Sequence, residues 1–277
     1  MQSLPDFGED LKLRSREQRL RRFKQIPLRF LAPNLITLLA LCSGVTAIRL
    51  GVEARYDLAV GAVIVAIVLD AVDGRLARFL KGTSRFGAEL DSLADFVNFG
   101  VAPAMLIYMW SLNSLKTLGW VAALCFAICC GLRLARFNVA LEDPDRPAWA
   151  MNFFTGAPAP AGAGLAMAPM YLGFLGLIPD GHTVAWAVLP YIVAVAFLMI
   201  SRVPTFSGKA LGSRISRDLV LPILGATALV AVCLIAFTWE VLTIMSLIYI
   251  ALLPVGVASW RRQKRAHEAR LAEAQAG

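Results

Sequence analysis

The chain has 277 residues, of which 58% are hydrophobic, and a formal net charge of +8. The apolar fraction exceeds the about 45–50% of soluble domains and predicts membrane-spanning helices. A basic chain could bind nucleic acid, but no polar segment combines a basic stripe with interleaved aromatic residues. Anionic lipid headgroups and a phosphate-bearing substrate are therefore the expected partners, and nucleic acid is not.

The cysteines and histidines disfavour several kinds of catalytic site. All five cysteines lie in apolar runs without paired ligand spacing, so we expect core residues, not disulfides or zinc ligands. His182 and His267 are far along the chain from the aspartates at 70–95, which disfavours Ser/His, Cys/His and His-ligated metal chemistry. Residues 1–27 are polar and basic, and we expect no signal peptide there.

The N-terminal segment is expected to lie on the membrane surface. Within residues 9–29, Leu13, Leu20 and Phe23 can share one helical face surrounded by Arg and Lys. This pattern is typical of a basic amphipathic helix in the headgroup plane, although a disordered arm fits the first ten residues equally well. We therefore predict a basic cytoplasmic arm over residues 1–31.

Eight apolar stretches have the about 17–25 residues that a membrane-spanning helix needs. Glycine and proline interrupt the fifth stretch, which membrane helices tolerate where they pack closely or line a cavity. The approximate ranges are 33–51, 57–80, 92–112, 117–138, 156–177, 184–202, 219–237 and 239–259.

The basic residues predict the orientation of these spans. With a cytoplasmic N-terminus, 24 of the 27 Lys and Arg residues lie in inner segments, and only Arg49, Arg55 and Lys116 lie in outer loops. This asymmetry indicates an even number of spans with both termini inside. Eight spans fit best, and six is the alternative if the weakest pair is re-entrant or interfacial. The expected fold is an all-α integral protein of the cytoplasmic (inner) membrane.

Four aspartates flank the loop between the second and third predicted spans. They form two pairs, Asp70 with Asp73 and Asp91 with Asp95, whose spacings of three and four residues put both members on one helical face. The predicted orientation places all four at the cytoplasmic side of the membrane. Charged groups at membrane depth indicate a functional site when cations accompany them.

Oxygen ligands without nearby His or Cys suit Mg²⁺, Mn²⁺ or Ca²⁺, and two such ions would clamp a diphosphate. Gly74 would let a ligand approach the backbone, and four basic residues between positions 75 and 85 could pair with anions. In one alternative the aspartates pair with these basic residues in a solvated loop; in another they belong to an ion pathway. Two observations disfavour the ion pathway. The aspartates cluster at one membrane face, and the other spans carry almost no ionisable residues that could continue it.

The pattern D-x2-D-G-x2-A-R-x8-G-x3-D-x3-D over residues 70–95 resembles, at every fixed position, the signature of the CDP-alcohol phosphatidyltransferase family. The resemblance implies a membrane enzyme with a six-helix catalytic core, usually a homodimer. Such an enzyme transfers a phosphatidyl group from a CDP-linked lipid to an alcohol and releases CMP. We expect this core over residues 32–202, two further transmembrane helices over 203–260, and a cytoplasmic tail over 261–277.

The resemblance also assigns roles within the signature. Asp70, Asp73 and Asp91 would ligate two divalent ions, Mg²⁺ or Mn²⁺, and Asp95 would touch the second ion and act as the general base. The positions that hold the CDP-lipid in relatives correspond to Gly74, Arg78 and Ser84, with Asn34 and Thr37 from the Pro-Asn-x2-Thr opening of the first span.

Segments at 32–44, 133–138, 154–164 and 198–209 resemble the family members that use serine as the acceptor. The implied substrates are CDP-diacylglycerol and L-serine, and the implied product is phosphatidylserine. A zwitterionic amino acid needs a cation for its carboxylate and an acceptor for its ammonium group. We take the candidates to be Arg133, Arg136 and Asn138.

Several alternatives remain open from the sequence. The acceptor could be glycerol 3-phosphate, inositol, inositol phosphate or a second lipid, and the basic residues at 133–209 could be membrane anchors or lipid-phosphate contacts. More distant alternatives are a divalent-cation transporter and a non-catalytic lipid-binding protein.

Overall fold

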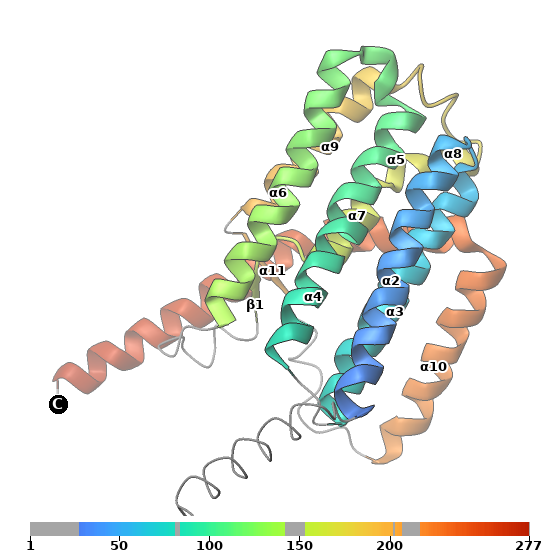
Figure 1. The fold of residues 1–277 in the computed structure, drawn as a ribbon. Helices are drawn as coiled ribbons and strands as arrows, with labels where there is room; N and C mark the ends of the chain where they lie inside the picture. The colour runs from blue at the N-terminus through green and yellow to red at the C-terminus, as the bar shows by residue number, and fades with distance from the viewer. Residues whose placement is uncertain (1–27, 81–83, 142–152, 202, 207–216, 277) are drawn as a thin grey trace, which may run out of the picture.

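The computed structural model describes residues 28–80, 84–141, 153–201, 203–206 and 217–276, and Figure 1 shows long helices lying side by side. The predicted basic arm lies almost entirely outside the described residues. The helices are α2 (Leu28–Val52), α3 (Tyr56–Phe79), α4 (Arg85–Asp95), the π-helical turn η1 (Phe96–Val101), α5 (Ala102–Trp110), η2 (Leu112–Leu115), α6 (Thr117–Leu141), α7 (Ala159–Ala166), α8 (Ala168–Phe174), α9 (Ala185–Ile200), α10 (Arg217–Ala236) and α11 (Thr238–Ala276).

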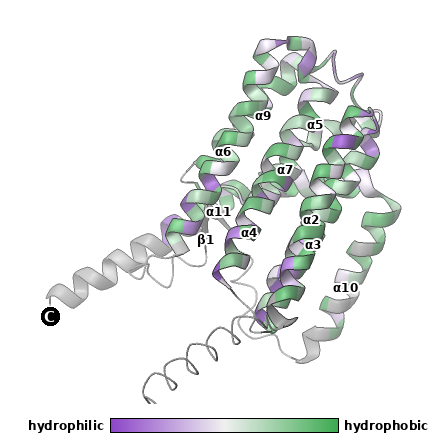
Figure 2. Cartoon of the chain, in the orientation of Figure 1, coloured by the Kyte–Doolittle hydropathy of each residue, from purple (hydrophilic) through white to green (hydrophobic). Residues whose placement is uncertain are grey.

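Helices occupy all eight predicted stretches, and in the part of the chain that the structure describes, four segments are long and apolar enough to cross a membrane. These four are Leu31–Val52, Arg85–Trp110, Thr117–Ala140 and Thr238–Arg262. Figure 2 shows hydrophobic residues over most of the helical surface, with hydrophilic residues toward the ends of the helices. The chain is an integral membrane protein. The count of eight spans and the side on which the termini lie stay predictions.

The described residues are helical almost throughout, as predicted, with one small addition. Two short strands, β1 (Phe153–Thr155) and β2 (Pro204–Phe206), pair antiparallel with Phe154 opposite Thr205. They join the segment before α7 to the segment after α9. Strands this short have no periodic pattern, so their pairing depends on how the surrounding helices pack.

The third helix begins earlier than its apolar run. The prediction began this span at residue 92, whereas α4 begins at Arg85, with Ser84 as its N-cap. The Ser84 hydroxyl accepts the Gly87 N–H at 2.9 Å, which satisfies one of the free donors of the first turn. Asp91 and Asp95 therefore lie within a continuous α4–η1–α5 segment and not at its start.

The fifth stretch, which was predicted as one span rich in glycine and proline, is a broken helix. A break at Met167 separates α7 from α8. Pro169 has no N–H to donate to the Leu165 carbonyl, and the Tyr191 hydroxyl of α9 donates to that carbonyl at 2.8 Å instead. A neighbouring helix thus supplies the donor that proline removed, as burial in a membrane requires.

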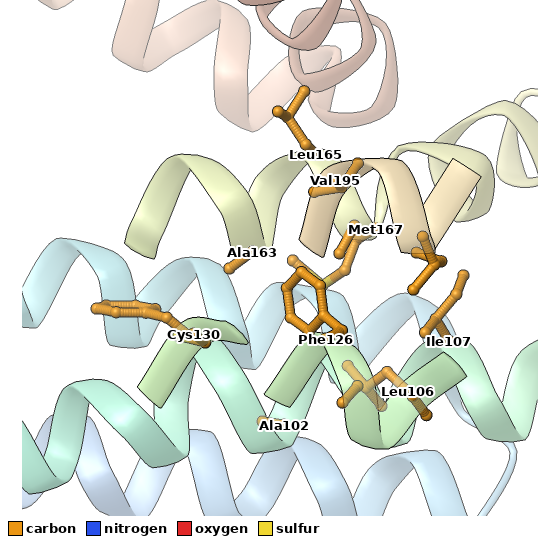
Figure 3. Packing of buried hydrophobic residues seen from close by; sticks show 14 of the residues in the cluster. Ala102, Leu106, Ile107, Phe126, Cys130, Ala163, Leu165, Met167 and Val195 are labelled. Atoms are coloured by element: carbon orange, nitrogen blue, oxygen red, sulfur yellow. The ribbon is translucent and has the colours of Figure 1, made fainter. Parts of the chain in front are cut away.

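The core lies where α5, α6, α7 and α9 meet. Figure 3 shows Phe126 of α6 among Leu106 of α5, Val195 of α9 and Met167, which lies at the break between α7 and α8. Phe126, Leu106 and Met167 are fully buried. This packing holds α5, the apolar half of the α4–η1–α5 segment, in the core. The position of α4, the acidic half, is therefore fixed by the packing of α5.

Helix α2 packs along α3 and also contacts α4, η1 and α5. The Ser43 hydroxyl donates to the Ala62 carbonyl of α3 at 2.8 Å. At the start of α3, the Tyr56 hydroxyl donates to the Met109 carbonyl of α5 at 3.1 Å. Helix α2 is therefore a shared neighbour of the two helices that carry the aspartates.

Candidate active site

Three aspartates from two helices converge into one cluster. Carboxylate oxygens of Asp70, on α3, and of Asp91 and Asp95, on α4, lie within 4.8 Å of one another. The four-residue spacing on α4 aligns Asp91 with Asp95, and the packing of α2 against both helices brings Asp70 to them. The structure thus joins residues that are up to 25 positions apart in the sequence.

This cluster is unfavourable without a cation. At an effective dielectric constant of about 20, two unit charges about 5 Å apart repel by about 3 kcal/mol. Asp95 Oδ1 is buried, and no group among the described residues donates a hydrogen bond to it. An all-carboxylate donor set with an unpartnered oxygen fits a hard divalent cation such as Mg²⁺ or Mn²⁺.

The fourth aspartate has a different environment. Asp73 is 3% exposed, and its Oδ2 accepts a hydrogen bond from the Thr37 hydroxyl of α2 at 2.6 Å. It lies one turn beyond Asp70 but outside the group of three whose oxygens converge. Thr37, which the sequence assigned to the CDP-lipid, here contacts an acidic residue of the signature.

The other CDP-lipid candidates lie near the end of α3 and the starts of α2 and α4. Gly74 is exposed, and no atom lies within 4 Å of where a Cβ would be, so its backbone is open to a ligand. The Arg78 side chain is also exposed, and its Nε donates to the Gly74 carbonyl at 3.0 Å. Asn34 Oδ1 would lie 2.8 Å from a Cβ on Gly87, so Asn34 occupies the space that this glycine leaves at the α2–α4 contact.

Arg133 of α6 is a buried cation that faces the cluster. Its side chain is 8% exposed, interacts electrostatically with Asp95, and lies over the Phe137 ring at 5.4 Å. Gly131 allows α6 to pack closely on η1, because a Cβ at position 131 would lie 3.1 Å from the ring of Phe96, the residue after Asp95. Among the described residues, Arg133 has no ion pair or hydrogen bond, which leaves its guanidinium available to an anion.

The other two acceptor candidates already have protein partners. Arg136 is exposed, and its side chain donates to the Ile200 carbonyl at the end of α9 at 2.7 Å. Asn138 is also exposed, and its amide donates to the Ser92 hydroxyl of α4 at 2.8 Å. Of the three candidates, Arg133 is the one whose charge interacts with Asp95.

Two polar residues near the site were not anticipated from the sequence. Asn98, 1% exposed, lies in the π-helical turn directly after Asp95, and Tyr249 of α11 interacts electrostatically with Arg133. An amide in the apolar run of residues 96–110 was the available signal for Asn98. The prediction treated the segment of α11 up to residue 260 only as a further transmembrane helix, and the position of Tyr249 beside Arg133 depends on tertiary structure alone.

An acidic, metal-compatible cluster beside a buried arginine, within membrane helices, indicates the functional site of a membrane protein. Comparison with protein families identifies the class of this membrane protein. The model of the CDP-alcohol phosphatidyltransferase family matches residues 30–200, and that of CDP-alcohol phosphatidyltransferase 2 matches residues 218–254. The chain belongs to the CDP-alcohol phosphatidyltransferase family.

Similar curated proteins carry the name CDP-diacylglycerol–serine O-phosphatidyltransferase. One from Mycobacterium leprae is 42% identical over 176 residues, which are 62% of this chain and 57% of that protein. One from Mycobacterium tuberculosis is 35% identical over 233 residues, which are 83% of this chain and 79% of that protein. One from Helicobacter pylori is 34% identical over 179 residues, 64% of this chain and 73% of that protein.

Proposed function

We propose that this protein transfers the phosphatidyl group of CDP-diacylglycerol to the hydroxyl of L-serine and forms phosphatidylserine and CMP. The observation that carries the proposal is the buried Arg133 guanidinium beside the cluster of Asp70, Asp91 and Asp95. The names of the similar proteins support serine as the acceptor. The serine carboxylate would bind the Arg133 guanidinium, and the serine hydroxyl would then lie near the base in the aspartate cluster.

In this mechanism Asp95 acts as the general base. Its carboxylate takes the proton of the serine hydroxyl, and the hydroxyl oxygen forms a bond to the β-phosphorus of the CDP-lipid. The bond from that phosphorus to the oxygen shared with the α-phosphate breaks, and CMP leaves with the bonding electrons. Arg133 binds the serine carboxylate and thereby holds the hydroxyl near Asp95.

Divalent ions, Mg²⁺ or Mn²⁺, would be held by Asp70, Asp91 and Asp95, with Asp73 beside them, and would neutralise the diphosphate charge. We propose two ions per site. The exposed Gly74 backbone and the Arg78 side chain would hold the CDP moiety at the open end of the cluster. Asn34, Thr37 and Ser84 would shape this end chiefly through their contacts with α3 and α4.

We place the aspartate cluster toward the cytoplasmic side of the inner membrane, because the Lys and Arg asymmetry supports a cytoplasmic position for the loop between α3 and α4. There the lipid headgroup and a soluble alcohol can meet. In the apolar segment Thr238–Arg262 of α11, only 6% of the most apolar window is buried inside the protein. This exposed helix supports the proposal of a homodimer within the membrane.

The acceptor is tested by supplying purified protein with CDP-diacylglycerol, Mn²⁺ or Mg²⁺ and one labelled alcohol at a time. We expect CMP release and labelled lipid with serine, but not with glycerol 3-phosphate, inositol or inositol phosphate. Labelled lipid from another alcohol and none from serine would overturn the choice of acceptor. Metal flux through proteoliposomes without consumption of CDP-lipid would instead indicate a transporter.

Thr37→Val tests the hydrogen bond to Asp73. We expect turnover to fall about tenfold or more and the half-saturating Mn²⁺ concentration to rise, since a hydrogen bond to a charged group contributes about 1.5–3 kcal/mol. CMP release across a Mn²⁺ titration measures both effects. The control is Thr46→Val on the same helix, whose hydroxyl only caps the Cys42 carbonyl.

A higher KM for CDP-lipid in Thr37→Val, with the Mn²⁺ requirement unchanged, would contradict this role. That result would support direct contact between Thr37 and the CDP-lipid.

A further inference from the structure

The segment after Asp95 is a π-helical turn that contains a buried amide. Residues Phe96–Val101 form η1, and Asn98 within it is 1% exposed. Among the described residues, no donor is in hydrogen-bonding position for Asn98 Oδ1. Burying an unpaired polar atom costs about 1–3 kcal/mol, and π-helical turns are frequent at functional sites. Both features suggest that this turn has a role beyond packing.

Asn98 is packed directly against Gly44 of α2. A Cβ on Gly44 would overlap Asn98 Oδ1 and would lie 3.2 Å from the Asn98 Cα, so the two helices approach almost backbone to backbone. In glycine that direction is occupied by a hydrogen, which points at the amide oxygen as a weak Cα–H···O contact. Small residues allow such approaches between membrane helices, and polar side chains hold them together.

Helix α2 also contacts the aspartate pair of α3, through Thr37. Thr37 precedes Gly44 by seven residues, so both lie on one face of α2, two turns apart. Thr37 binds Asp73 of α3, and Gly44 receives Asn98 of η1. Helix α2 therefore contacts both aspartate-bearing segments, each through one polar side chain.

We propose that Asn98, docked on Gly44, is a positioning residue that fixes the rotation and depth of Asp95; this inference rests on the proposed function. A π-helical turn holds more residues than an α-helical turn, so it sets the rotational phase between α4 and the anchored α5. If the turn relaxed, Asp95 would rotate away from Asp70. Asn98 itself is too deeply buried to contact substrate.

The test compares Asn98→Ala, Gly44→Ala and the double variant. We expect each single variant to lose about 10²-fold in kcat, because small displacements of reacting groups have effects of that size. The KM values for CDP-diacylglycerol and serine should change little, while the half-saturating Mn²⁺ concentration rises. Gly61→Ala on α3 is the control, because a Cβ there meets no atom within 4 Å and the rate should stay at the wild-type value.

The double variant separates positioning from independent damage. If Asn98 and Gly44 act as one contact, the double variant loses no more than the worse single variant. Independent effects would multiply to about 10⁴-fold and would overturn the proposal. A monodisperse size-exclusion profile for each variant verifies folding.

Two further outcomes are decisive. Wild-type kcat in Asn98→Ala would overturn the inference, as would a loss confined to the KM values. The proposed function is judged separately, by whether the wild-type protein makes a labelled lipid from serine.

Discussion

Asp95→Asn is expected to reduce turnover by about 10³-fold or more while CDP-diacylglycerol still binds. A general base contributes about 10²- to 10⁴-fold, and asparagine can neither take the serine proton nor supply a carboxylate oxygen to a metal. The variant removes the negative charge and replaces one carboxylate oxygen of Asp95 with an amide nitrogen, which can neither accept a proton nor bind a metal ion. CMP release measures turnover, and equilibrium binding of a labelled CDP-lipid measures retention.

Two sets of control variants are compared with Asp95→Asn to separate loss of the base from loss of a surface charge or a metal ligand. Asp57→Asn, an exposed acid in the first turn of α3, should behave like the wild type. Asp91→Asn and Asp70→Asn should raise the Mn²⁺ requirement, and excess Mn²⁺ should restore part of their rate but not that of Asp95→Asn. Full turnover in Asp95→Asn would rule out Asp95 as the base and reopen the non-catalytic lipid-binding alternative.

The local part of the site could be read from the sequence because helix geometry converts spacing into direction. Asp91 and Asp95 are four residues apart, so they had to share a face once α4 formed. The apolar run after residue 95 predicted a membrane helix, and the prolines and glycines of the fifth stretch identified it as the most irregular span, which the break at Met167 explains. These features depend on neighbours within one or two turns.

Contacts between distant segments could not be read in the same way. Thr37 reaches Asp73 across 36 positions, and Gly44 meets Asn98 across a still longer separation. Such pairs depend on helix rotation and crossing geometry, which an apolar run does not specify. The pairing of β1 with β2 was not predicted for a similar reason, because three-residue strands have no sequence pattern of their own.

The acceptor candidates illustrate the difference most clearly. The sequence offered Arg133, Arg136 and Asn138 as equivalent polar groups at the end of one helix. Three-residue spacing puts Arg133 and Arg136 near the same face, yet one is buried beside Asp95 and the other is exposed and bonded to Ile200. The contact between α6 and η1 makes this distinction, and it appears only in the folded chain.

Arg133→Gln should therefore lose about 10²- to 10³-fold in kcat/KM for serine, mostly through KM. Truncating one partner of a buried charge pair costs about 2–5 kcal/mol, and serine would lose the cation that binds its carboxylate. Arg133→Lys keeps the charge and should recover part of the rate. Arg136→Gln, an exposed matched control on the same helix, should remain near the wild-type value.

The acceptor itself provides the sharpest control for Arg133. Ethanolamine has the hydroxyl and ammonium groups of serine but no carboxylate, so the wild-type protein should use it poorly and Arg133→Gln should use it no worse. The preference for serine over ethanolamine should then collapse in Arg133→Gln. An equal loss on both acceptors would mean that Arg133 acts on Asp95 or on the CDP-lipid, because only a contact with the carboxylate distinguishes the two alcohols. Since Arg133 faces Asp95 and has no ion pair among the described residues, we expect the selective loss.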